Sequence, residues 1–155
     1  TIDYVTRLNG IGVPGSIQVG SDLFFVRRRL VDTTGVAPAR SDGVLGDPQF
    51  QAQGRFRYTN DFFTFVTNVN YVGEQLTSRF NRGPSPNDTR EFDKYDDYAT
   101  VDSSISFNVE KRFTLTAVVT NLFNRVGQEY YGIIIPASIN DSLGRRFALS
   151  ARVSY

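Results

Sequence analysis

The sequence predicts an all-β protein, and more specifically a segment of an antiparallel, up-and-down transmembrane β-barrel. Three observations carry this prediction: apolar residues recur with period two, short and long connections alternate strictly, and aromatic residues gather near both ends of the predicted strands. No stretch keeps a 3.6-residue period, so almost no helix is expected.

The alternation is clearest in the segment 49–59. There Phe50, Ala52, Gly54, Phe56 and Tyr58 alternate with Gln, Arg and Thr. Successive strand side chains point to opposite faces, so such a segment has one apolar and one polar face. The same pattern predicts seven strands in all, at about 1–9, 16–26, 49–59, 62–72, 98–110, 113–123 and 146–155.

The connections between these strands fall into two classes. Short ones lie at about 9–15, 59–61 and 110–112, and long ones at about 27–48, 73–98 and 124–143. Strict alternation places every short turn at one rim and every long loop at the other, as in outer-membrane barrels with short periplasmic turns and long extracellular loops. Structureless loops of about 20 residues are uncommon in a compact soluble domain.

Strand length and aromatic placement agree with a membrane setting. Strands of about 10 to 13 residues, tilted near 40°, cover the ~25 Å apolar band of an outer membrane. Smaller residues such as Val19, Ser21, Ala117 and Ala151 lie mid-strand, with Phe65 as an exception. The alternative is a soluble barrel or sandwich whose aromatic residues fill a core. Aromatic residues fall near the short turns (Phe56, Tyr58, Phe63, Phe113, Tyr155) and near the long loops (Phe25, Phe50, Tyr71, Tyr98, Phe123, Phe147).

The composition excludes several functions. The 155 residues contain no Cys and no His, which removes thiol nucleophiles, imidazole bases and the usual zinc or haem ligands. We therefore predict no enzyme and no cofactor. A net charge of +1 argues against nucleic acid as a partner. No apolar run reaches the length of a membrane helix, and no signal-peptide core is present at the N-terminus.

The predicted strand number is odd, whereas single-chain bacterial outer-membrane barrels have even numbers. An open seven-strand sheet would leave two unpaired edges in lipid, where each unsatisfied backbone group costs several kcal/mol. We therefore expect the chain to be the C-terminal part of a larger barrel, or one piece of a split barrel. A fragment would also explain the missing signal peptide.

Three motifs in the last third of the chain carry a family resemblance. They are Tyr98-Ala99-Thr100-Val101-Asp102, Asn121-Leu122-Phe123-Asn124, and Gly144-Arg145-Arg146-Phe147 followed by an aromatic-terminated strand. In this order and spacing they resemble the C-terminal end of TonB-dependent outer-membrane receptors, and the first hundred residues match more loosely. The resemblance implies a 22-stranded barrel in the bacterial outer membrane, closed by an N-terminal plug, that imports a scarce nutrient such as a siderophore, vitamin or sugar.

On this interpretation residues 1–155 form barrel wall and extracellular loops, without the plug domain or the TonB box. The implied partners are the remainder of the barrel with its plug, the TonB energy-transducing complex reached through the missing N-terminal part, the barrel-assembly machinery, and outer-membrane lipid with lipopolysaccharide. Two alternatives stay open: a passive pore or scaffold subunit that completes a split barrel, and a soluble β binding module. The sequence leaves the transported substrate undetermined.

The last strand also resembles the C-terminal signal read by the barrel-assembly machinery. Ser150 stands where that signal usually has Gly, and the alternative is a lipid-facing strand with no further role. Deleting Tyr155 from the full-length protein is expected to lower its folded, heat-modifiable amount. The apolar positions of the strand are Phe147, Leu149, Ala151, Val153 and Tyr155.

Four loop residues are candidate ligand contacts: Arg79, Arg82, Tyr130 and Tyr131. The two tyrosines precede the apolar run 133–136, and an exposed apolar and aromatic patch is typical of a binding surface. Packing of one loop on another is the alternative.

For the other charged residues, a binding role and ordinary solvated charge are both possible explanations. No metal site is assigned; if Ca²⁺ bound anywhere, Asp93, Asp96 and Asp97 would be its candidate ligands, against ordinary solvated loop charge. Arg27, Arg28 and Arg29 are candidates for a lipopolysaccharide phosphate, against ordinary rim and lumen charge. Charged residues of the polar phase are expected to face the lumen and to form ion pairs there (Asp22, Arg55, Arg57, Asp102, Glu110, Arg152).

Overall fold

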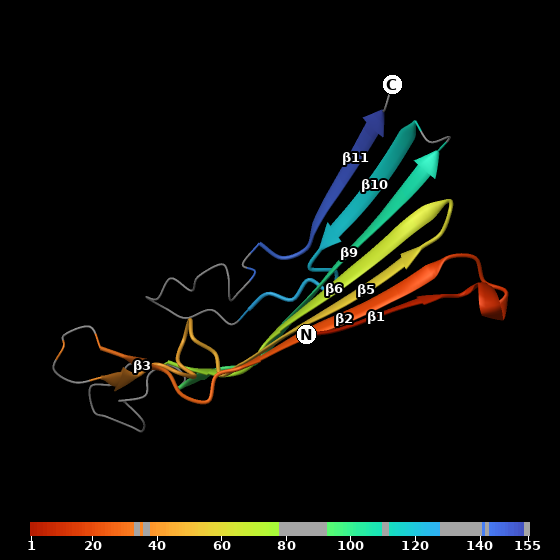
Figure 1. Ribbon diagram of the computed structural model, residues 1–155. Coiled ribbons are helices and arrows are strands. Elements are labelled where there is room, and N and C mark those ends of the chain that lie inside the picture. The colour runs from red at the N-terminus through yellow and green to blue at the C-terminus, as the bar shows by residue number, and fades with distance from the viewer. Residues whose placement is uncertain are drawn as a thin grey trace.

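The computed structural model describes residues 1–32, 35, 38–77, 93–109, 112–127, 141 and 143–153. Seven strands form one antiparallel sheet in which each strand pairs with the next along the chain, as predicted (Figure 1). The sheet is not closed, because within the described residues its two outer strands each have a neighbour on one side only. The strands are β1 (Ile2–Arg7), β2 (Ser16–Phe25), β5 (Phe50–Thr59), β6 (Phe63–Val72), β9 (Tyr98–Val109), β10 (Phe113–Thr120) and β11 (Arg146–Val153).

Short and long connections lie at opposite ends of the sheet, which confirms the predicted meander (Figure 1). Two of the long connections contain small hairpins that the sequence pattern does not predict. One consists of β3 (Leu30–Val31) and β4 (Ala39–Arg40), and the other of β7 (Gln75–Leu76) and β8 (Lys94–Tyr95).

The first two short turns are formed in different ways. Asn60 Oδ1 accepts the backbone N–H groups of Phe62 and Phe63 at 2.9 and 2.8 Å, so an Asx turn reverses the chain between β5 and β6. Between β1 and β2 the chain forms the 3-10 helix η1 (Asn9–Ile11), which ends at Gly12 with a φ of 78°. Within the described residues no helix is long and apolar enough to cross a membrane.

Two strands are shorter than the 10 to 13 residues expected: β1 has 6 residues and β10 has 8. β11 has 8 residues up to the last residue that the structure describes. The predicted strand 113–123 ends early because Asn121 adopts a φ of 54°, which turns the backbone out of the sheet. The other four main strands have 10 to 12 residues.

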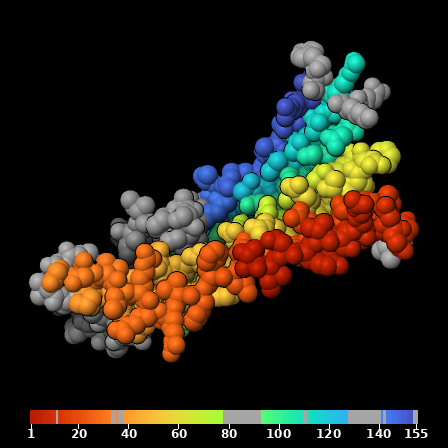
Figure 2. Space-filling view, viewed as in Figure 1, coloured from red at the N-terminus to blue at the C-terminus, as the bar shows by residue number. Residues whose placement is uncertain are grey.

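No second layer covers the sheet in the described part of the chain (Figure 1), and in Figure 2 the segment after β2 extends beyond the strands at one end of the sheet. Tyr95, in a loop hairpin, is the single buried hydrophobic residue among those described. Large apolar side chains on the strands are exposed instead, including Ile2 (70%), Leu149 (73%) and Phe147 (76%). Exposed apolar side chains in such number are unusual for a protein surface in water, where they are found mainly at interaction surfaces.

Candidate functional site

The strand registers place all the apolar-phase residues on one face, which we call the apolar face. Directly opposed residues share a face, as in the series Val19, Phe56, Thr67 and Ser103 across β2, β5, β6 and β9. None of its members is charged. The apolar face consists of Ile2, Tyr4 and Thr6 of β1, the odd-numbered residues 17–25, the even-numbered residues 50–58, and the odd-numbered residues 63–71, 99–109, 113–119 and 147–153.

Aromatic rings gather near both ends of the apolar face. Near the short turns, Phe63 lies 5.5 Å from Tyr58 and 6.1 Å from Phe107, measured between ring centroids. Near the long loops, Phe50 and Tyr71 lie 5.8 Å apart. Tyr98 also lies near the long loops, as predicted, but it pairs with Val72 and so lies on the opposite face of the sheet.

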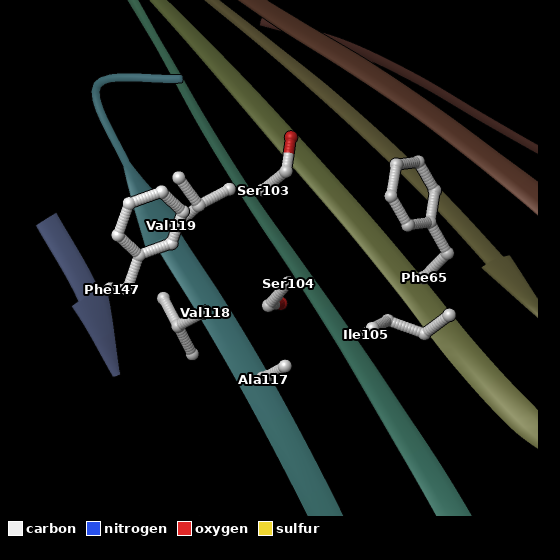
Figure 3. Close-up of a pocket in the computed structure, with 8 residues that line it drawn as sticks. All are labelled: Phe65, Ser103, Ser104, Ile105, Ala117, Val118, Val119 and Phe147. Atoms are coloured by element: carbon white, nitrogen blue, oxygen red, sulfur yellow. The ribbon is translucent and has the colours of Figure 1, made fainter. Parts of the chain in front are cut away.

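A shallow depression of about 320 Å³ lies in the apolar face. Figure 3 shows Phe147 on one side of it and Phe65 on the other, with Ser103, Ile105 and Ala117 between them. The depression follows from the small side chains at mid-strand, which leave a hollow between larger neighbours.

The opposite face, which we call the polar face, carries the charged strand residues. Arg55 Nη1 lies 2.8 Å from Asp22 Oδ2 on β2, and Arg55 Nη2 lies 3.5 Å from Asp3 Oδ1 on β1. The predicted cross-strand ion pairing is therefore confirmed for Arg55 and Asp22. Hydroxyl groups also pair across strands, as between Ser106 and Thr116 at 2.9 Å.

The three motifs of the C-terminal third meet at the long-loop end of β9, β10 and β11. We call this cluster the loop-end junction; its members are Tyr98, Asp102, Asn121, Asn124, Asp141, Gly144, Arg145 and Arg146. Asn121 is fully buried, and its backbone N–H donates to Asp102 Oδ1 at 2.8 Å. Its side-chain amide accepts the Arg125 N–H at 2.8 Å and donates to the Arg125 carbonyl at 2.7 Å and to Asp141 Oδ2 at 3.3 Å.

Tyr98 and Asp141 make the remaining hydrogen bonds of the loop-end junction. The Tyr98 hydroxyl donates to the Arg125 carbonyl at 2.8 Å and accepts the Asp141 N–H at 3.1 Å. The Arg146 guanidinium, 2.7 Å from Asp141 Oδ1, lowers the pKa of the Asp141 carboxyl from its ordinary value. Both ends of the last long loop are thus fastened to each other and to β9.

The second half of the junction depends on Asn124 and Gly144. Asn124 Oδ1 accepts the Arg145 N–H at 2.9 Å. Gly144 has a φ of 69°, a backbone conformation that favours glycine. A Cβ atom at this position would also lie 2.7 Å from that same Asn124 oxygen, which is too close. The Arg145 guanidinium stands 5.8 Å from the centroid of the Phe147 ring, where the apolar face begins.

A second polar cluster organises the loop between β2 and β5. Asp42 is fully buried and accepts hydrogen bonds from the side chains of Arg40 and Gln49 and from the Arg29 backbone N–H. The Arg40 guanidinium and these neutral donors hold the pKa of Asp42 well below its usual range. Arg29 also pairs with Asp47 at 2.9 Å.

Backbone hydrogen bonds join this loop to the next long loop. The Leu45 N–H donates to the Leu76 carbonyl at 2.9 Å, and the Leu76 N–H donates to the Gly43 carbonyl at 2.7 Å. The side chain of Gln75, which is also buried, accepts the Gly46 N–H at 2.8 Å. The described parts of the two loops therefore form one connected unit at this end of the sheet.

The structure places only some of the predicted site residues. Phe147, Leu149, Ala151 and Val153 lie on the apolar face, opposite β10. Tyr155 and the four ligand-contact candidates, Arg79, Arg82, Tyr130 and Tyr131, lie outside the described residues.

The remaining charged candidates lie in described loop segments. Asp93, Asp96 and Asp97 are among them, and within the described part of the chain no three acidic side chains are arranged to hold a metal ion. Of the three arginines after β2, Arg29 is paired with Asp47, whereas Arg27 and Arg28 have no ion-pair partner among described residues.

Sequence reasoning missed the buried roles of Asn121 and Asp42. Asn121 carries a usable signal, because an Asn that ends a strand pattern is a frequent residue at positive φ. Asp42 carries none, since its burial depends on contacts between separate parts of a loop. No protein-family model, no curated protein and no solved structure was found to match this chain.

Proposed function

We propose that this chain forms part of the wall of a larger transmembrane β-barrel in the bacterial outer membrane, with the apolar face toward lipid and the polar face toward the lumen. The barrel is a receptor of the TonB-dependent kind that binds and imports a small-molecule nutrient. In it the short turns lie on the periplasmic side, and the long loops form the extracellular surface that meets the nutrient.

One observation carries the proposal: an uncharged face extends across all seven strands, and no described residue covers it. A soluble sheet hides such a face under a second layer. In a bilayer the same face needs no cover, because lipid tails are as apolar as the side chains. Alternation of this apolar face with a charged face is the pattern of an outer-membrane strand.

The edges of the sheet support a barrel larger than the chain. β1 and β11 each leave one row of backbone groups without a strand partner among the described residues. Unsatisfied backbone groups are costly in lipid, so further strands are expected to pair with both edges. The number of those strands, 22 in total for the receptor family, comes from the motif resemblance.

The contacts at the long-loop end of the sheet favour a receptor over a barrel that has no binding surface. The loop-end junction and the Asp42 cluster fix the bases of two long connections through hydrogen bonds of the buried side chains of Asn121 and Asp42. Fixed bases present a defined surface at one end of the barrel, which recognition of a nutrient requires.

The test uses the absence of Cys from the chain, which makes a single introduced Cys unique within it. Ser103 and Ser104 are adjacent serines of β9 on opposite faces, so Ser103→Cys and Ser104→Cys form a matched pair. Each variant of the full-length protein is labelled with bimane and reconstituted in lipid vesicles. We expect nitroxide-bearing lipid to quench the label at 103, and aqueous iodide to quench it at 104.

A second pair of variants is needed because Ser103→Cys removes the hydrogen bond between the Ser103 and Thr67 hydroxyl groups. Ala151→Cys and Ser150→Cys on β11 offer the same contrast without that bond. Quenching by iodide at both members of each pair would refute the membrane proposal. Steady ion conductance of the full-length protein in planar bilayers would instead favour a passive pore over a receptor with a closed lumen.

A further inference from the structure

Four amide side chains lie next to one another on the polar face, toward the long loops. The register places Gln53 of β5 directly opposite Asn70 of β6. Gln51 lies two residues from Gln53 toward the long loops, and Asn68 lies two residues from Asn70 toward the short turns. Opposed side chains have Cβ atoms about 5 Å apart, and residues two apart on a strand are separated by about 7 Å. The four residues therefore form one surface, which we call the amide patch.

The fold does not use the amide patch in the described part of the chain. Other amides near the long loops make specific hydrogen bonds, since Gln49 donates to Asp42 and Gln75 accepts the Gly46 N–H. No side chain of the amide patch makes a hydrogen bond to another described residue. Its two glutamines are exposed and its two asparagines are half-buried. The donors and acceptors of the patch are therefore open to a ligand.

The charged side chains around the amide patch already have partners. Arg55, opposite Asn68 on β5, pairs with carboxylates of β1 and β2. Asp102, opposite Asn68 on β9, accepts the backbone N–H of Asn121. Arg146, further along the same cross-strand row, pairs with a carboxylate of the last long loop. Among the described strand residues, the rows of the patch thus offer amide and hydroxyl groups but no charge without a partner.

An aromatic ring borders the amide patch on the side of β2. Phe24 lies opposite Gln51 and is the only phenylalanine among the described strand residues of the polar face. It is 57% exposed, so its ring is accessible beside the amide groups. An exposed ring next to hydrogen-bonding side chains suits a ligand that has both an apolar side and polar groups.

We propose that the amide patch and Phe24 bind the nutrient, and that the nutrient is a neutral saccharide. Each amide both donates and accepts hydrogen bonds, and each sugar hydroxyl does the same, so the two kinds of group satisfy each other. A carboxylate or phosphate only accepts, which would leave the amide carbonyl groups without donors. The C–H side of a sugar ring is apolar and can pack on the Phe24 ring. The inference rests on the proposed function, because a receptor lumen is what brings a nutrient to this face.

The length of the amide patch favours an oligosaccharide over a single sugar. The levels of Gln51 and Asn68 are four residues apart along a strand, which is about 13 Å. Hydroxyl groups of neighbouring sugar rings can therefore be bound together. Beyond Asn68 lies a recess of about 220 Å³ that Gln18 and Arg57 also line. Arg57 has no ion-pair partner among the described residues, so an anionic ligand would be held there and not on the patch.

The experiment measures binding of the full-length protein to an array of neutral oligosaccharides, with uronic-acid oligosaccharides and citrate as anionic probes. Gln53→Met and Asn70→Leu keep the approximate size of each side chain and remove its hydrogen-bonding groups, and Phe24→Leu removes the ring. Asn108→Leu is the matched control, because Asn108 also lies on the polar face of a strand but near the short turns. The heat-modifiable amount of each variant is measured first, so that binding is compared at equal amounts of folded protein.

We expect at least one neutral oligosaccharide to bind, and the anionic probes not to compete with it. Gln53→Met, Asn70→Leu and Phe24→Leu should each weaken that binding about tenfold, whereas Asn108→Leu should leave it unchanged. The inference would be overturned if no neutral oligosaccharide bound, if only the anionic probes bound, or if all three variants bound as tightly as the unaltered protein. Face-specific quenching of the Cys variants in that case would leave the barrel proposal standing, whereas iodide quenching at both members of each Cys pair would refute the proposed function itself.

Discussion

Arg55 on β5 reaches Asp3 on β1, two strands away, because the position between them on β2 is Gly20. A Cβ atom at residue 20 would lie 2.4 Å from Asp3 Oδ1 and 3.2 Å from Arg55 Nε. Because residue 20 has no side chain, the Arg55 guanidinium can extend across β2 and pair with carboxylates on both β1 and β2. Asp22, on β2 itself, takes the shorter contact.

Gly20 and Gly15 should respond differently to replacement by Ala. At residue 20 the obstructing atoms belong to flexible side chains, so Gly20→Ala should displace Asp3 and change stability by less than about 0.5 kcal/mol. At residue 15, φ is 110° and the new Cβ would lie 2.3 Å from the Thr59 carbonyl oxygen. Gly15→Ala should therefore lose about 1 to 3 kcal/mol. Urea unfolding in lipid vesicles measures the stability of both variants. Equal losses of stability would contradict the conclusion that the side chains around residue 20 can move aside.

Asn121→Ala should destabilise the loop-end junction by about 2 kcal/mol, because the fully buried Asn121 amide makes hydrogen bonds to Arg125 and Asp141 that alanine cannot make. Alanine at a φ of 54° adds strain, so Asn121→Gly should be less damaging by about 1 kcal/mol. Asn70→Ala, at a strand position of the polar face, is the control and should change little. Unfolding temperatures of the three variants give the order, and a harmless Asn121→Ala would show that the junction is dispensable.

Asp42 should make the loop unit sensitive to acid. Because its pKa in the folded protein is lowered below the ordinary 3.8, its stabilising effect is complete above that value and is lost as pH falls toward the lowered pKa. Asp42→Asn should therefore lower the unfolding temperature at pH 7, and the gap from the unaltered protein should shrink steadily below pH 4.

The exposed turn residue Asp61 supplies the control for that series. Asp61→Asn should leave the unfolding temperature unchanged at pH 7, since Asp61 has no ion pair among the described residues. A gap for Asp42→Asn that stays constant from pH 7 to pH 2 would exclude the charge of Asp42 as its cause.

Leu149 and Ala148 are neighbours on β11 that face opposite sides of the sheet. In a bilayer, Leu149→Arg should cost about 2 to 4 kcal/mol, because it places a charge in lipid, whereas Ala148→Arg should cost little. Reversible unfolding from lipid vesicles compares the two. An increase in stability or solubility with Leu149→Arg would indicate that this face meets water.

Much of the sheet follows from sequence pattern alone. Alternation of apolar and polar residues identifies all seven strands. The alternating short and long connections predict the order of the strands in the sheet, because in a meander each strand pairs with the next one along the chain. The strand ends are less predictable: β10 ends at Thr120 because of the backbone at Asn121, whose positive φ depends on bonds to Asp141 and Arg125.

The sequence by itself determined that each strand has one apolar and one polar side, since neighbouring residues of a strand point to opposite faces and apolar residues recur at every second position. The tertiary structure alone decided the cross-strand register, and register is what joins seven separate stripes into one uncharged face. It also moved Tyr98 to the polar face, buried Asp42, and left Arg57 without the carboxylates that Arg55 has. Each of these depends on residues distant in the chain, which only strand pairing and loop closure bring together.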